Sequence, residues 1–253
     1  MTPQPPAVPD ALIEKLVAAR EIVAFTGAGV SAESGVPTFR GPDGIWAKFK
    51  PEELASMEAF MKNPALVWEW YAHRRTIISA VQPNPGHVAL AALENVIPRV
   101  TVVTQNIDNL HRRAGSKRLF ELHGNIERSY CMKCGKAYPD IGVVEKGSIP
   151  RCNCGGTIRP DVVWFGEMLP EGAWEASVAA TTNADMFFSI GTSAVVYPAA
   201  SLPFLAKRNG ALVVEINPDP TPLTESADWY LQGPSGVLLP EIYRRILELK
   251  RKA

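Results

Sequence analysis

Short apolar runs alternate with segments of helical pattern along this chain. Apolar, β-prone runs predict buried strands at Ile22 to Thr26, Val100 to Thr104, Met186 to Ile190 and Ala211 to Ile216, and a further strand end at Phe120 to His123. Helical patterns cover 11–20, 52–80, 87–95 and 237–250, and the second of these is broken near Asn63-Pro64. Strands that alternate with helices are typical of a parallel sheet, so the pattern predicts an α/β fold.

Two segments depart from this alternation. Residues 44–86 read as helical, whereas 129–159 lacks long apolar runs and holds all four cysteines. We therefore expect a single catalytic domain (1–253) with a large lobe formed by 1–43, 87–128 and 160–253. The two insertions, one helical and one metal-binding, are expected to form a smaller lobe.

Composition excludes several classes of protein. The 253 residues are 46% hydrophobic and 21% charged, as in an ordinary globular protein. The 26 basic and 26 acidic residues balance, which argues against a nucleic-acid surface. No apolar run approaches the ~20 residues of a membrane span. The Pro-rich N-terminus lacks the pattern of a secretory signal, so we expect a monomeric cytoplasmic protein that binds neither nucleic acid nor membrane.

A glycine-rich turn follows the first predicted strand. Gly27, Gly29 and Ala32 give G-x-G-x-x-A, in which the glycines permit a tight turn and close approach of a pyrophosphate. A plain strand–turn–helix connection is the alternative. The motif favours a Rossmann-like fold, but the acidic residue that normally holds the ribose is missing, because Asp43 lies in a turn and follows no second strand. Phe39 and Arg40 lie in a loop suited to cover a ligand.

The cysteines form two pairs. Cys131-x-x-Cys134 and Cys152-x-Cys154 are separated by 17 residues, close to the C-x₂-C, C-x₂-C pattern of zinc ribbons, although the second pair is one residue short. Disulfides and isolated thiols are the alternatives, and a reducing compartment disfavours the former. Four thiolates fill a tetrahedral zinc ion and leave no place for water, so we expect one structural zinc.

The histidines differ in how well their positions suit a catalytic role. His123 follows a predicted strand end and precedes Gly124-Asn125, where a side chain would face a crevice at the sheet edge. His73 and His87 fall on predicted helices and are expected to be structural, whereas His111 is ambiguous. No G-x-S-x-G nucleophile motif accompanies them.

Seven blocks together resemble one family. They are Gly27-Ala-Gly-Val-Ser31, Gly35-Val-Pro-Thr-Phe-Arg-Gly41, Thr104-Gln-Asn-Ile-Asp-Asn-Leu-His111, Leu122-His-Gly124, the cysteine cluster, Val162-Val-Trp-Phe-Gly-Glu167 and Gly191-Thr-Ser193. In this order they resemble the sirtuins, the NAD-dependent protein lysine deacylases. The resemblance implies that NAD is consumed, that nicotinamide leaves and that the acyl group ends on ADP-ribose. It also implies an acylated lysine in an extended peptide as the second substrate.

The resemblance assigns roles residue by residue. It implies His123 as general base, with Asn106 and Asp108 as further catalytic residues. It implies NAD contacts from Gly27, Ala28, Gly29, Ser31, Thr38, Phe39, Arg40, Trp46, Gln105, Asn106, Ile107, Asp108, Gly191, Thr192, Ser193, Asn217 and Ser235. It implies that the peptide lies against Val162, Val163, Phe165, Gly166 and Glu167.

Tyr71 and Arg74 share a helix face, because they are three residues apart. Spacing alone favours a surface aromatic beside a solvated cation. The resemblance instead implies the sirtuin class that prefers negatively charged acyl groups, so succinyl- and malonyl-lysine would exceed acetyl-lysine as substrates. The alternatives are a deacetylase without this preference and a mono-ADP-ribosyltransferase. Outside the family, a nicotinamide dehydrogenase and a zinc-ribbon interaction module are the competing hypotheses.

Overall fold

A six-stranded parallel sheet forms the centre of the molecule. The computed structural model describes residues 8–39, 44–45 and 50–252. The sheet has the order β3-β2-β1-β7-β8-β9, and every neighbouring pair is parallel. Its strands are β1 (Glu21–Thr26), β2 (Arg99–Thr104), β3 (Leu119–Glu121), β7 (Met186–Ile190), β8 (Leu212–Asn217) and β9 (Trp229–Gln232). The order reverses between β1 and β7, which is where a sheet of this kind opens a crevice for ligands.

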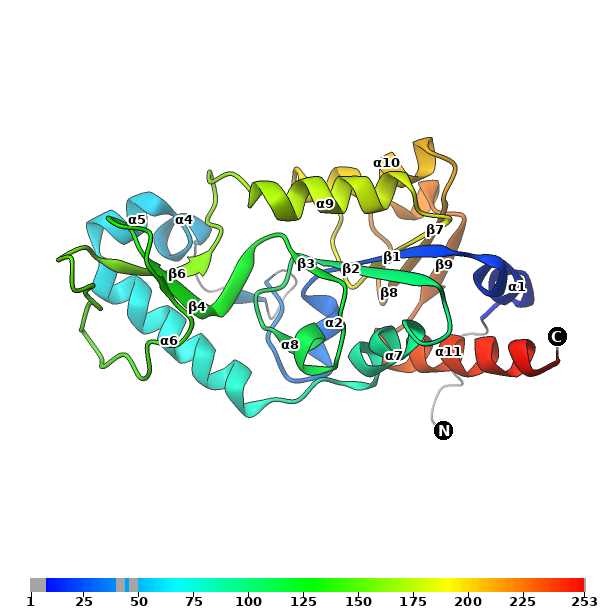
Figure 1. Cartoon of the computed structure of the whole chain (residues 1–253), viewed down its shortest axis with the longest axis horizontal. Helices are drawn as coiled ribbons and strands as arrows, with labels where there is room; N and C mark the ends of the chain where they lie inside the picture. The colour runs from blue at the N-terminus through cyan, green and yellow to red at the C-terminus, as the bar shows by residue number, and fades with distance from the viewer. Residues whose placement is uncertain (1–7, 40–43, 46–49, 253) are drawn as a thin grey trace.

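Helices cover both faces of this sheet (Figure 1). On one face lie α1 (Asp10–Ala18), α7 (Pro85–Leu93) and α11 (Ser235–Lys252), whose Leu16, Leu90 and Leu238 share a core with Ile22 and Ala24 of β1. On the other lie α9 (Glu171–Thr182), η1 (Ala199–Ser201) and α10 (Leu202–Arg208). There Leu202 joins a second core with Val23 and Phe25. The alternation along β1 therefore places successive side chains on opposite faces.

A second, antiparallel sheet lies beyond the first (Figure 1). Its order is β5-β4-β6, formed by β5 (Ala137–Tyr138), β4 (Gly124–Cys131) and β6 (Ile158–Val162). It packs against the helical segment α4 (Pro51–Leu54), α5 (Met57–Lys62) and α6 (Pro64–Ala80). Phe60, Trp68 and Trp164 are fully buried in the core that these elements share.

The break expected in residues 52–80 is confirmed. Helix α5 ends at Lys62, and the Asn63 side chain then accepts a hydrogen bond from the Leu66 N–H (3.1 Å), so it caps α6. Pro64 occupies the first turn of α6, where its missing N–H has no cost. The sequence pattern assigned no element to α9, α10 or β9. The expected lobe boundaries stay predictions.

Three short elements complete the fold. They are α2 (Gly29–Ala32), α8 (Leu110–Arg113) and η2 (Thr224–Ser226). The first two follow β1 and β2 at the carboxyl edge of the large sheet, so they position the residues discussed next. No helix in the described part of the chain is long and apolar enough to cross a membrane.

Candidate active site

A pocket of about 590 Å³ opens at the carboxyl edge of the large sheet. The residues that line it follow β1, β2, β3, β7 and β8, belong to β6 and the loop after it, or lie on α6 and in the loops before α6. One pocket thus gathers side chains from both sheets and from α6.

Backbone alone forms the wall where the strand order reverses. The Gly29 N–H donates to the Gly191 carbonyl (2.8 Å), and the Gly27 N–H donates to Ile190 (3.0 Å). Gly191 has a φ of 56°, and a Cβ there would lie 2.4 Å from the Val30 nitrogen. A Cβ on Gly29 would lie 2.7 Å from the Gly191 Cα. Glycine is therefore required at both turns, and their close contact makes a cradle that suits a diphosphate.

The residues after β2 form a polar cluster beside this cradle. The Asn106 amide donates to the Gly27 carbonyl (3.0 Å) and to Ser31 Oγ (3.1 Å). Ser31 Oγ donates to Asp108 Oδ2 (2.7 Å). Burial raises the pKa of Asp108, while bonds from the Leu110 N–H and Ser31 oppose the rise. Asn106 lines the pocket, whereas Ser31 and Asp108 are buried beside it and do not.

His123 presents one free ring nitrogen to the pocket. Its Nδ1 lies 2.8 Å from the Gln105 carbonyl oxygen, which can only accept. Nδ1 therefore carries the proton and Nε2 carries the lone pair. Burial lowers the pKa of His123, although the bond to Gln105 opposes this, so the ring is neutral at pH 7. Nε2 is placed to accept a proton from a group bound in the pocket.

The other histidines serve the fold. His87 forms a capping box with Asn84 at the start of α7, and its Nε2 lies 3.3 Å from Ser31 Oγ. His111 is buried, with Nε2 2.9 Å from Thr26 Oγ1 and its ring 4.8 Å from the His87 ring. Burial lowers the pKa of both, to about 4 for His87. Exposed His73 lies on α6.

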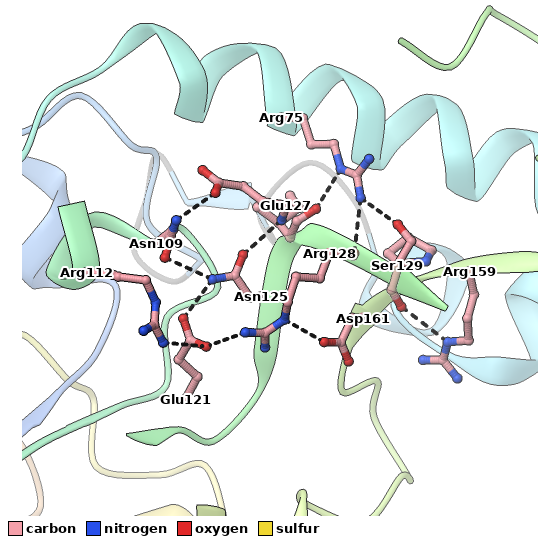
Figure 2. A network of polar contacts seen from close by, with 12 residues as sticks. Arg75, Asn109, Arg112, Glu121, Asn125, Glu127, Arg128, Ser129, Arg159 and Asp161 are labelled. Atoms are coloured by element: carbon pink, nitrogen blue, oxygen red, sulfur yellow. Dashed lines mark hydrogen bonds and ion pairs between the residues drawn. The ribbon is translucent and has the colours of Figure 1, made fainter. Parts of the chain in front are cut away.

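A network of hydrogen bonds and ion pairs joins the end of β3 to the second sheet (Figure 2). The Glu121 carboxylate accepts from Asn125 (2.7 Å) and from Arg128 (2.9 Å), and Arg112 lies 3.5 Å away. Arg128 also donates to Asp161 of β6 (2.8 Å). Because Glu121 ends β3 and the other sheet begins at residue 124, these contacts fix the segment that carries His123.

Arg74 is a buried cation at the α6 side of the site. Only 6% of it is exposed, and its guanidinium carbon lies 4.6 Å from the Phe39 ring centroid and 5.1 Å from that of Trp70. Its Nε and Nη1 have no hydrogen-bond partner among the described residues. Burial lowers its pKa, although Tyr71 and Asp108 oppose this. The interpretation of Arg74 as a solvated surface cation is therefore wrong.

The four cysteines are brought together. All are free thiols, and their sulfur atoms lie within 4.8 Å of one another. Cys131 Sγ is 3.5 Å from Cys154 Sγ, and Cys134 Sγ is 3.7 Å from Cys152 Sγ. Zinc–sulfur bonds of ~2.3 Å in a tetrahedron place sulfurs about 3.8 Å apart, so the cluster fits a zinc ion despite its short second pair. A Cβ on Gly156 would lie 2.7 Å from Cys131 Sγ, so a side chain at this position would collide with the cluster. The sequence did not predict this steric constraint.

Comparison with known proteins identifies the family. The model of the Sir2 family matches residues 27–198. The chain belongs to the Sir2 family. It is 52% identical to the NAD-dependent protein deacylase 2 of Pyrobaculum aerophilum over 238 residues, which are 94% of each chain. Among solved structures, a mutant Sir2 homologue with ADP-ribose has a TM-score of 0.95 at 42% identity, covering 97% of this chain and 99% of that one. A Sir2 homologue with NAD has a TM-score of 0.90 at 43% identity, covering 97% and 96%.

Most site residues expected from the sirtuin resemblance line the pocket of this Sir2 family chain. They are Gly27, Ala28, Gly29, Thr38, Phe39, Gln105, Asn106, Ile107, Gly191, Thr192, Ser193, Asn217, His123, Tyr71, Val162, Val163, Phe165, Gly166 and Glu167. Ser31, Arg74, Asp108 and Ser235 are buried and do not line it. Arg40 and Trp46 lie outside the described residues.

The sequence patterns did not predict one wall of the pocket. Residues 218–222, Pro-Asp-Pro-Thr-Pro, follow β8 and line the pocket beyond Asn217. The buried Glu215 carboxylate holds this segment, since it accepts from Thr221 Oγ1 and Thr224 Oγ1 at 2.5 Å each. Alternating prolines directly after a strand were the available signal. Ala55, Trp70 and Val196 also line the pocket without having been assigned a site role, and so does Trp164, which belongs to the Val162–Glu167 block but was given no role.

Proposed function

We propose that this chain is an NAD-dependent protein lysine deacylase, which releases nicotinamide and transfers the acyl group to ADP-ribose. One observation carries the proposal: a single pocket joins the Gly27–Gly29–Gly191 cradle to the free Nε2 of His123. The cradle suits a diphosphate because the glycines let the main chain of two turns approach closely without side chains between them. NAD supplies the ribose carbon that accepts the acyl oxygen and the nicotinamide that leaves.

The residues of the chain have defined tasks in this scheme. The cradle and residues 191–193 would hold the diphosphate, and Asn217 with the Pro218–Pro222 wall would hold the adenosine. Asn106, fixed by Gly27 and Ser31, would orient the nicotinamide end together with Asp108. His123 Nε2 would remove a proton from a ribose hydroxyl, because its other nitrogen is committed to Gln105.

The substrate peptide would lie along the segment after β6. The Val163 N–H donates to the His123 carbonyl (2.9 Å), and the Phe165 N–H donates to Ala55 (2.9 Å). These bonds hold residues 163–165 beside His123, and the chain then turns at Gly166, where the Glu167 N–H donates to the Trp164 carbonyl (3.0 Å). An acylated lysine in an added strand could then reach inward between Val163 and Phe165.

The acyl group is proposed to be acidic. Arg74 is buried with two donor nitrogens that no described residue accepts from, and Tyr71 lines the pocket beside it. A guanidinium binds a carboxylate by paired hydrogen bonds, whereas an acetyl group offers no charged acceptor. Succinyl- and malonyl-lysine should therefore be better substrates than acetyl-lysine.

The four cysteines are proposed to hold one structural zinc ion. The sulfur geometry fits a closed tetrahedral site, which leaves no coordination position for water and hence no part in the reaction. The free cysteines and the balanced charge support a cytoplasmic location. We further propose a monomer that binds neither nucleic acid nor membrane.

The test is mass spectrometry of succinyl-, malonyl- and acetyl-lysine peptides incubated with and without NAD. We expect NAD-dependent loss of the acyl group, equimolar nicotinamide and faster turnover of the acidic substrates. Formation of NADH would instead support a dehydrogenase. ADP-ribose attached to protein without deacylation would support a mono-ADP-ribosyltransferase. Equal rates on all three peptides would leave a deacylase without acyl preference.

A further inference from the structure

Trp164 makes a directed hydrogen bond to Tyr71. Its indole Nε1 lies 2.9 Å from the Tyr71 hydroxyl oxygen, and the two residues are 2% and 3% exposed. An indole N–H can only donate, so the Tyr71 oxygen accepts. The hydroxyl proton of Tyr71 must then point away from Trp164. No described residue accepts that proton, while Tyr71 itself lines the pocket.

Trp164 cannot easily turn away, because the ion pair between buried Arg159 and half-buried Glu167 holds it. The Arg159 guanidinium carbon lies 3.5 Å from the Trp164 ring centroid, and the Phe60 ring lies 5.1 Å away. Arg159 donates to both oxygens of Glu167, at 2.5 and 2.9 Å. Glu167 Oε2 also accepts from the Trp164 backbone N–H (2.8 Å). Side chain and backbone of Trp164 are thus fixed by the same pair.

We propose that Trp164 is a positioning residue for acyl specificity, which fixes the Tyr71 hydroxyl as a hydrogen-bond donor to the carboxylate of an acidic acyl chain. The inference rests on the proposed preference for such chains. An ionised carboxylate only accepts, so it gains from a hydroxyl whose oxygen is held by Trp164 and whose proton is directed away from Trp164. Burial raises the pKa of Tyr71 to about 12, so the proton stays in place at neutral pH. Arg74 supplies the charge, and Trp164 supplies the orientation of the second donor.

A double-mutant cycle tests this inference. Trp164→Phe removes the N–H and keeps an aromatic ring, Tyr71→Phe removes the hydroxyl, and the double variant removes both. The readout is the ratio of kcat/KM for succinyl-lysine to that for acetyl-lysine. We expect each single variant to lower the ratio about tenfold, the usual scale for a lost hydrogen bond to a charged group. In the Tyr71→Phe background, Trp164→Phe should cause no further change in the ratio.

Trp68→Phe is the matched control. Trp68 is also buried, and its Nε1 also donates a hydrogen bond, to the Ile158 carbonyl (2.9 Å), but among the described residues no hydrogen bond or ring contact joins it to Tyr71. This variant should lower stability and leave the ratio unchanged. Equal proportional losses on both substrates in Trp164→Phe, or independent losses in the double variant, would overturn the inference. A wild-type protein without preference for succinyl-lysine would instead refute the acyl proposal on which it rests.

Discussion

Replacing Arg74 by methionine should make the protein more stable and less selective. The guanidinium is 6% exposed, and its Nε and Nη1 lack hydrogen-bond partners among the described residues. A buried, unsatisfied donor costs about 1–3 kcal/mol. Methionine has a similar length and keeps sulfur–aromatic contact with the Phe39 and Trp70 rings, which offsets the lost cation–π attraction of ~0.5–2 kcal/mol.

The balance of these contributions predicts a gain in stability. Asp108 loses the attraction of the Arg74 charge but keeps its hydrogen bonds from Ser31 and the Leu110 N–H, so removing Arg74 leaves no hydrogen-bonding group newly unpaired. We expect the free energy of unfolding to rise by about 1 kcal/mol, which corresponds to roughly 2–4 °C in Tm for a chain of this length. Function should change in the opposite direction. Loss of a charged hydrogen bond of ~1.5–3 kcal/mol lowers kcat/KM for succinyl-lysine by about ten- to a hundredfold.

The assay compares thermal unfolding with kcat/KM on succinyl- and acetyl-lysine peptides for wild type, Arg74→Met and Arg75→Met. Arg75 is the neighbouring arginine, but it donates to the Ile126 carbonyl (2.6 Å) and to Ser129 Oγ (2.9 Å). Its removal should therefore lower stability and preserve the ratio between substrates. The reasoning about Arg74 would be refuted by a destabilised Arg74→Met protein that loses both activities to the same extent, because Arg74 would then serve the fold.

Three further predictions concern the base, the metal and acid stability. His123→Ala should lower NAD-dependent deacylation by about 10²–10⁴-fold with an unchanged circular dichroism spectrum, and a folded variant with near wild-type turnover would contradict the assignment. Elemental analysis of freshly purified protein should give one zinc per chain, and less than about half an equivalent of zinc would count against the site. Cys131→Ser should lower Tm more than it changes kcat. The unfolded chain protonates His87 near pH 6.5, whereas burial in the folded chain lowers its pKa to about 4. Stability should therefore fall as the pH drops through this range, by up to ~3 kcal/mol from this group, and urea titrations showing constant stability between pH 6.5 and 4 would refute it.

The sequence predicted the centre of the sheet better than its margins. The runs at Ile22 to Thr26 and Met186 to Ile190 form strands because they are buried on both faces and therefore consist mostly of apolar residues. Helix α9 gave no such signal, since its buried positions are Ser177 and Thr181. Its larger apolar residues, Trp174 and Val178, pack against the core but are only partly buried. Edge strand β9 is only partly buried and was missed for a related reason.

In the candidate site, too, local motifs predicted some positions, whereas other features depend on contacts between residues far apart in the chain. Gly27, Gly29 and Gln105 could be placed at strand ends because parallel strands bring their carboxyl ends to one edge. The burial of Arg74 could not be read from spacing. It depends on Phe39, which lies 35 positions earlier in the chain. The Tyr71–Trp164 bond likewise spans 93 positions.

Main chain forms one end of the pocket and side chains form the other, so the two ends can diverge differently during evolution. The cradle at Gly27, Gly29 and Gly191 consists of main chain in contact with main chain, so any side chain there collides with its neighbour. No series of tolerated substitutions can gradually reshape it. At the other end, Tyr71 lines the cavity and Arg74 lies buried beside it, and side chains of this kind can be exchanged without moving the backbone. Descendants of this chain can thus change the acyl group that they recognise in single steps, while the nucleotide that they require stays the same.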